Sequence, residues 1–180
     1  MKKRLLIGAI CTSLLGCAEL SSLTKTLSPP TFSDKDFEGD WYCETFYDID
    51  RGWTMQSKEH INVYPNNKLV SKGVMIFKEP MHGVDFTYEY SFTGKQYIRG
   101  WDMITTQDAG SFKVKRAFDA QVKKFLQENK DFVEPEKVNF ELMKSIGEQA
   151  GNKMVTEIEL VTESEIISRS RNAYSVCRRK

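Results

Sequence analysis

The sequence predicts a mainly β protein, an antiparallel meander that closes into a barrel, with a two-helix insertion before the last strands. Three observations support this. After residue 37, most of the chain consists of short runs of alternating apolar and polar residues separated by turn residues. Residues 117–151 instead carry apolar residues at helical spacing. A meander of eight or nine strands also leaves unpaired edges unless it closes on itself.

The first residues differ from the rest of the chain. A basic start, Met1 to Arg4, precedes an apolar run from Leu5 to Leu15, as in a secretory signal peptide. The run is too short for the roughly 20 apolar residues of a membrane-spanning helix. The order Leu14-Leu15-Gly16-Cys17 resembles the lipobox of bacterial lipoproteins, which implies cleavage before Cys17 and its acylation. An ordinary signal peptide is the alternative.

We therefore expect a signal peptide at residues 1–16, a lipidated N-terminus and flexible tether at 17–36, and a barrel domain at 37–180. The tether is rich in Ser, Thr, Lys and Pro. Two or more acyl chains give stable anchoring, so a membrane is one expected partner. Because Ala18 rather than Asp follows the lipidation site, the resemblance implies, for a Gram-negative host, the outer membrane and a domain facing the periplasm.

Six strands are expected before the helices, at residues 41–48, 53–64, 69–78, 84–92, 97–103 and 111–116. The fourth alternates most regularly, with Val84, Phe86, Tyr88, Tyr90 and Phe92 on one face. Thr93-Gly94-Lys95 predicts a turn into the fifth strand.

The helical insertion contains two apolar stripes. Phe118, Val122, Phe125 and Leu126 form the first. The second helix begins near Pro135, ends near Gly151 and carries Val138, Leu142, Met143, Ile146 and Ala150. Strands return at residues 154–161, 165–169 and 174–179.

Two cysteines remain in the folded domain, because Cys11 leaves with the signal peptide and Cys17 carries the lipid. The expected compartment permits disulfides, so we expect a bridge between Cys43 and Cys177. Two free buried thiols are the alternative. The bridge would join the first strand to the last, which is the seam that a closed barrel requires.

Gly39-Asp40-Trp41 resembles the Gly-x-Trp that opens the first strand of lipocalin and calycin barrels. The resemblance implies that Trp41 plugs the closed end and that a basic residue near the chain end packs over it. If Cys43 lies opposite Cys177 on antiparallel strands, Trp41 lies opposite Arg179 on the same face. A guanidinium stacked on an indole is favourable. The other short motifs of that family are not found, and its usual single helix is replaced by two, so another antiparallel barrel or a sandwich is the alternative.

The sequence offers no catalytic or cofactor site. The two histidines, His60 and His82, accompany no Gly-x-Ser-x-Gly motif, and neither metal-ligand spacing nor a glycine-rich phosphate loop is found. The 26 Lys and Arg nearly balance the 25 Asp and Glu, which does not indicate nucleic-acid binding. We expect a non-enzymatic protein with no metal, no cofactor and no nucleic-acid partner.

An aromatic pocket is the expected binding site. The face of Phe86, Tyr88, Tyr90 and Phe92 would line the barrel, and Arg99 and Trp101 would share a face on the next strand. Glu59 is one expected partner for the Arg99 charge. Alternatively, Arg99 binds the carboxylate or phosphate of an apolar ligand, or the stripe is solid core and Arg99 reaches the rim.

Two functions follow from these expectations. The first is a lipid-anchored, periplasm-facing binding protein for a small apolar or amphiphilic ligand. The second is an accessory or structural subunit of a cell-envelope complex. It would bind a protein partner through the helical insertion or the basic C-terminal residues, Arg169, Arg171, Arg178, Arg179 and Lys180.

Overall fold

The structure is a computed structural model that describes residues 30–48, 54–79, 81–148 and 153–180. The chain divides into two units, Met1–Thr31 and Phe32–Lys180, and the second contains the barrel. The expected signal peptide and Cys17 lie outside the described residues. The second unit begins earlier than residue 37, because a capping box between Ser33 and Asp36 starts a 3-10 helix, η1 (Asp34–Phe37).

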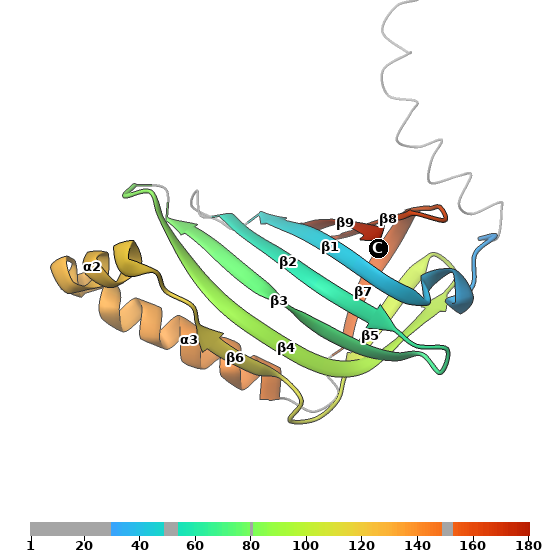
Figure 1. The fold of residues 1–180 in the computed structure, drawn as a ribbon, viewed down its shortest axis with the longest axis horizontal. Coiled ribbons are helices and arrows are strands. Elements are labelled where there is room, and N and C mark those ends of the chain that lie inside the picture. The colour runs from blue at the N-terminus through green and yellow to red at the C-terminus, as the bar shows by residue number, and fades with distance from the viewer. Residues whose placement is uncertain (1–29, 49–53, 80, 149–152) are drawn as a thin grey trace, which may run out of the picture. The chain divides into compact units, whose positions relative to one another are not determined.

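The described residues form nine strands in one antiparallel sheet, and eight of these close into a barrel (Figure 1). The strands are β1 (Gly39–Asp48), β2 (Thr54–Val63), β3 (Lys68–Glu79), β4 (Val84–Arg99), β5 (Asp102–Gln107), β6 (Lys113–Arg116), β7 (Lys153–Val161), β8 (Glu165–Ser170) and β9 (Ala173–Arg179). Their order is β3-β2-β1-β9-β8-β7-β5-β4-β6, and an additional β3–β4 pairing completes the ring. The predicted fold class, an antiparallel barrel with a helical insertion before the last strands, is confirmed.

Strand β4 is longer than predicted, because it has two partners on one edge. Its first half pairs with β6 and its second half with β5. The predicted turn at Thr93-Gly94-Lys95 is wrong, since Gly94 lies inside β4, where a Cβ atom would overlap the carbonyl oxygen of Thr106. The glycine therefore permits a close approach of two strands. The chain turns instead at Gly100, which has a φ of +63°.

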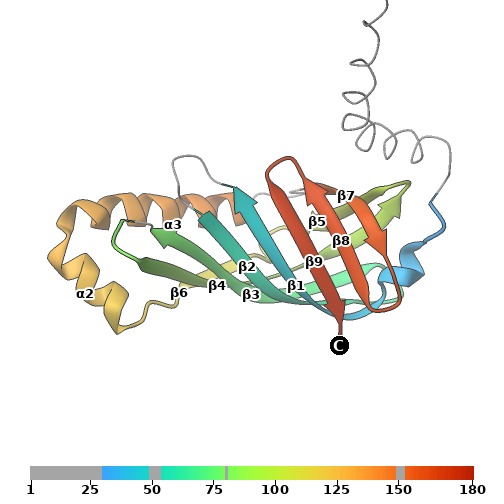
Figure 2. The same cartoon turned by 90° about the horizontal axis from the view of Figure 1, so that it is seen from above.

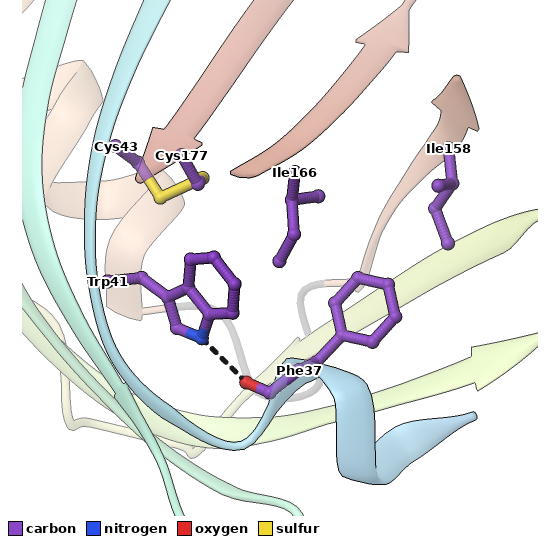
Figure 3. Packing of buried hydrophobic residues seen from close by; sticks show 6 residues of the cluster. All are labelled: Phe37, Trp41, Cys43, Ile158, Ile166 and Cys177. Atoms are coloured by element: carbon purple, nitrogen blue, oxygen red, sulfur yellow. Dashed lines mark hydrogen bonds between the residues drawn. A yellow bond between two sulfur atoms is a disulfide. The ribbon is translucent and has the colours of Figure 1, made fainter. Parts of the chain in front are cut away.

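The closed end is sealed where the first strand meets the last. Strands β1 and β9 pair with Cys43 opposite Cys177, and the two form the predicted disulfide (Figure 3). The same register places Arg179 opposite Trp41, with the guanidinium carbon 4.3 Å from the centre of the indole ring. The indole N–H donates to the carbonyl oxygen of Phe37 at 2.8 Å. Phe37, Trp41 and both cysteines are buried in one apolar cluster.

Arg179 also fastens the segment before β1. Its guanidinium donates to three backbone carbonyl oxygens, those of Asp36 at 3.0 Å, Glu38 at 2.7 Å and Glu163 at 2.8 Å. Gly39 has a φ of +114°, and a Cβ atom there would lie 2.8 Å from Nη1 of Arg179. The glycine of the Gly-x-Trp motif therefore makes room for the arginine and adopts a backbone conformation that other residues rarely take.

The helices α2 (Ala120–Glu128), η3 (Lys130–Phe132) and α3 (Val133–Glu148) lie toward the other end of the domain from η1 (Figure 2). Asp119 caps α2 by accepting a hydrogen bond from the Val122 backbone N–H at 2.8 Å. Val122 and Phe125 pack on Phe86 and Tyr88, as the first apolar stripe predicts. None of the described helices is both long and apolar enough to cross a membrane.

The predicted apolar stripe of the second helix is only partly correct. Val138 and Leu142 are 57% and 55% exposed, whereas Phe140 and Met143 pack on the core. Gly147 is buried, and a Cβ atom there would overlap the ring of Phe112. Compared with the predicted orientation, α3 is rotated about its axis, so that Gly147 rather than a larger apolar side chain contacts the Phe112 ring. Ala150 lies outside the described residues.

Removing the disulfide should destabilise the barrel. We expect the double variant Cys43→Ser, Cys177→Ser to lose about 2–5 kcal/mol in its free energy of unfolding, because the bridge closes a long loop in the unfolded chain. Urea denaturation of the oxidised protein and the variant measures the difference. The unmodified protein in excess reductant should match the variant. An unchanged midpoint in both samples would contradict this prediction.

Candidate ligand-binding site

The strand register arranges the inner face of β1–β4 in four layers. Counted from the closed end, the first layer contains Trp41, Ile61, Ser71 and Phe92, and the second contains Cys43, Glu59, Gly73 and Tyr90. The third layer contains Thr45, Ser57, Met75 and Tyr88, and the fourth contains Tyr47, Met55, Phe77 and Phe86. Successive layers are two residues apart along each strand, which corresponds to roughly 7 Å. The predicted aromatic face of β4 therefore contributes one residue to each layer.

A cavity of about 560 Å³ lies between α3 and the two outermost layers. It is lined by Phe77, Phe86, Tyr88, Asp131, Phe132, Pro135, Glu136, Asn139, Leu142 and Met143. Most of these side chains are aromatic or aliphatic, and the volume is in the range of small-molecule sites. Leu142 is more than half exposed, which places it at the rim of the cavity.

One charged cluster forms the polar part of the cavity wall. The Tyr88 hydroxyl donates to Oε1 of Glu136 at 3.0 Å, and Nε of Arg116 donates to the same oxygen at 2.8 Å. Arg116 also covers the ring of Phe140, at 3.8 Å from its centre. Burial, and then the negative charge of Glu136, raise the pKa of Tyr88 well above its usual value. Tyr88 is therefore a neutral donor, and the two charges of the cluster compensate each other.

The opposite wall of the barrel is lined by hydroxyl groups, which the sequence analysis missed. Five neighbouring strands, β7, β8, β9, β1 and β2, contribute Thr156, Ser168, Ser175, Thr45 and Ser57. The hydroxyl of Thr45 donates to that of Ser175 at 3.0 Å. Among the described residues, the buried hydroxyl of Thr156 has no hydrogen-bond partner, whereas that of Ser57 lies against the hydroxyls of Tyr47 and Tyr90. The alternating small polar residues of these strands were the available signal.

Glu59 lies in the second layer, deep inside the barrel. Its Oε2 accepts a hydrogen bond from the Ser71 hydroxyl at 2.6 Å, and the Tyr90 hydroxyl lies against the same carboxyl group. Burial raises the pKa of Glu59, and the hydrogen bonds from Ser71 and Tyr90 oppose this effect only in part.

The predicted pairing of Glu59 with Arg99 is wrong. Because β4 continues through Gly94 without a turn, Arg99 lies on the opposite face from Phe92, exposed and beside Asp102. Trp101 is also not in the cavity. It lies in the turn after β4, with its ring 5.3 Å from that of Phe32 at the closed end. Neither residue lines the cavity under α3.

The four aromatic residues predicted for the pocket have different surroundings. Phe86 and Tyr88 line the cavity. Tyr90 lies beside Glu59, and Phe92 packs with Val63 and Leu69 in a separate apolar cluster. The aromatic stripe is therefore a cavity wall at one end and solid core at the other.

A buried carboxyl group at the tip of the β3–β4 hairpin holds the hairpin on the helices. Glu79 accepts hydrogen bonds from the backbone N–H groups of Met81 at 3.1 Å and His82 at 2.6 Å, and lies 2.9 Å from Nδ1 of His82. Burial favours a higher pKa for Glu79, but these hydrogen bonds outweigh it, and its pKa is lowered. The His82 ring lies 5.1 Å from Phe125 and 5.5 Å from Phe132. This contact fixes the position of Phe132 in the cavity wall.

The part of the chain that the structure describes contains no group of three or more His, Cys, Asp or Glu side chains placed to bind a metal ion. No protein-family model matches the sequence, and no curated protein matches it. Among solved structures, the fold is similar to a lipocalin-like protein from Bacteroides uniformis, with 15% identity and a TM-score of 0.42. The match covers 81% of this chain and 99% of that chain. At this level the likeness carries no argument, and the fold assignment rests on strand order and register.

The buried Glu59 should make the stability of the barrel fall with rising pH. Its pKa is raised in the folded protein, so between the unfolded and folded pKa values the folded state binds more protons, and its stability decreases as pH increases. Glu59→Gln keeps an acceptor for Ser71 but cannot ionise. We therefore expect its stability relative to the unmodified protein to improve as pH rises above the usual glutamate pKa, until Glu59 is also ionised in the folded state, as measured by urea unfolding at several pH values.

The exposed Glu89, which pairs with Lys115 at 2.8 Å, provides the control for this experiment. Glu89→Gln should show no such improvement. A Glu59→Gln difference that is constant with pH would contradict the prediction.

Proposed function

We propose that this protein binds a small apolar or amphiphilic molecule in the cavity under α3 and does not catalyse a reaction. The observation that carries the proposal is the cavity itself, with about 560 Å³ of volume and a mostly aromatic and aliphatic lining. An apolar ligand body would contact Phe77, Phe86 and Met143, and burial of this surface would supply most of the affinity.

A binding role fits the state of the polar groups near the cavity. Glu136 is neutralised by Arg116, and Tyr88 donates to the same carboxylate. His82 is held by Glu79 and by two aromatic rings. These groups are engaged with one another, which favours a role in shaping the site over a role in acid–base or nucleophilic chemistry.

We also propose that the domain is attached to a membrane through an acylated Cys17 and faces the periplasm of a Gram-negative host. The Leu14–Cys17 sequence supports this proposal. The Cys43–Cys177 disulfide agrees with it, because structural disulfides persist in oxidising compartments.

A protein partner is the second candidate function. The supporting observation is the pair Val138 and Leu142, one turn apart on α3 and both more than half exposed. Two apolar side chains on one exposed helix face are a small docking surface. The cavity is the larger feature, and ligand binding is therefore the first proposal.

A cavity-filling variant tests ligand binding. We expect Met143→Trp to weaken binding of the fluorescent probe N-phenyl-1-naphthylamine by about tenfold or more, because the larger ring occupies the site. Glu141→Trp places the same side chain on the exposed side of α3, away from the cavity, and should bind the probe as the unmodified protein does. Fluorescence titration measures both. Absence of probe binding to the unmodified protein, or equal binding by both variants, would refute a ligand site under α3.

The anchor is tested separately. In a Gram-negative expression host, Cys17→Ser should move the protein from the membrane fraction to the soluble fraction, because no acyl chain can be attached. Immunoblots of the two fractions measure the distribution. A Cys17→Ser protein that stays in the membrane fraction would contradict lipid anchoring.

A further inference from the structure

We propose that Glu59 binds a cationic head group, so that the preferred ligand is an amphiphile with a primary amine at one end. This inference rests on the proposed binding function and specifies the ligand class.

The position of Glu59 suits the end of an elongated ligand. Tyr88 lines the cavity under α3, and Tyr90, the next inward residue of β4, lies in the same layer as Glu59. The carboxyl group is therefore one layer, roughly 7 Å, deeper in the barrel than the cavity wall. A ligand whose apolar chain fills the cavity would direct its other end toward Glu59.

The Glu59 side chain is partly accessible inside the barrel. Glu59 is only partly buried, although it belongs to a central strand and points inward. Its neighbours on the same face, Cys43, Ser57 and Ser71, are at most 2% exposed, so the backbone of these strands contributes almost no exposed surface. The exposed part of Glu59 is therefore its side chain, in space that a water-sized molecule can reach inside the barrel.

Within the part of the chain that the structure describes, Glu59 has no cationic partner. The ion pairs of the described residues join Lys58 to Glu44, Arg116 to Glu136, and other pairs that do not include Glu59. Lys58 precedes Glu59 on β2 and so points to the outer face. A buried carboxylate is strongly favoured by a compensating positive charge, and here a ligand can supply it.

The surrounding hydroxyls fit an ammonium group. An alkylammonium has three N–H donors. The carboxyl group accepts hydrogen bonds from Ser71 and Tyr90, and its two oxygens have about four acceptor positions in all, so further positions remain. The hydroxyl of Ser57, two residues away on the same face of β2, is buried and lies against the hydroxyls of Tyr47 and Tyr90. Ser71 and Tyr90 hold the carboxyl in place, so its remaining acceptor positions are oriented before a ligand binds.

An anionic head group does not fit this site. The expected anion-binding residue, Arg99, lies on the outer face, and the guanidinium of Arg116 is already paired with Glu136. A carboxylate or phosphate that reached the second layer would meet Glu59. The arrangement therefore selects among amphiphiles by the charge of the head group.

Competition by three compounds with the same chain tests the inference. Dodecylamine, dodecanol and dodecanoate are titrated, below the concentrations at which they form micelles, against N-phenyl-1-naphthylamine bound to the protein. We expect dodecylamine to compete about tenfold more tightly than dodecanol, and dodecanoate to compete least. In Glu59→Gln, the amine and the alcohol should compete equally, with the affinity for the alcohol unchanged. Glu89→Gln, altered on the outer face, should retain the preference.

The outcomes separate the two proposals. Failure of dodecanol to displace the probe would contradict ligand binding under α3. Competition by dodecanol with no preference for the amine would refute the role of Glu59 and leave ligand binding intact. A preference for the amine that persists in Glu59→Gln would refute it equally.

Discussion

The rest of the barrel depends on the contact between β1 and β9. An eight-stranded antiparallel sheet is stable as a closed surface only if its first and last strands meet in register. Here the disulfide fixes that register covalently, and Arg179 adds a stack on Trp41 and hydrogen bonds to carbonyl oxygens on both sides of the seam. Counted from Trp41 at this seam, the registers of β1–β2, β2–β3 and β3–β4 place Glu59 and Tyr90 in the second layer of the interior.

The two ends of the domain are built differently. The end with η1 is a tight apolar cluster around Phe37 and Trp41. The other end is covered by helices that meet β4 through Val122 and Phe125 and leave a cavity beneath α3. Between them, aromatic side chains line one wall and hydroxyls the other. This combination permits a ligand with both apolar and polar parts, because each part meets a matching wall.

Sequence patterns predicted the fold well, because alternation, helical spacing and cysteine parity are local or pairwise properties. The pairing of Trp41 with Arg179 follows from the two cysteines by arithmetic alone. The candidate site was less predictable. In the sequence alone, a glycine such as Gly94 is compatible both with a turn and with a strand that approaches its neighbour closely. Because a turn was predicted there, Arg99 was assigned to a separate strand and to the inner face of the barrel. Similarly, the orientation of α3 depends on Gly147 meeting Phe112, a tertiary contact that helical periodicity does not encode.

Both ends of the folded domain leave it on the same side. Phe32 packs on Phe37 and Trp101 at the closed end, and the backbone N–H of Lys180 donates to the carbonyl oxygen of Asp40 beside it. A linker fused directly to either end of the Phe32–Lys180 unit is therefore joined to it beside the apolar cluster around Phe37 and Trp41. The helices lie toward the other end of the domain (Figure 2), so immobilisation of the Phe32–Lys180 unit through either of its ends keeps the cavity accessible.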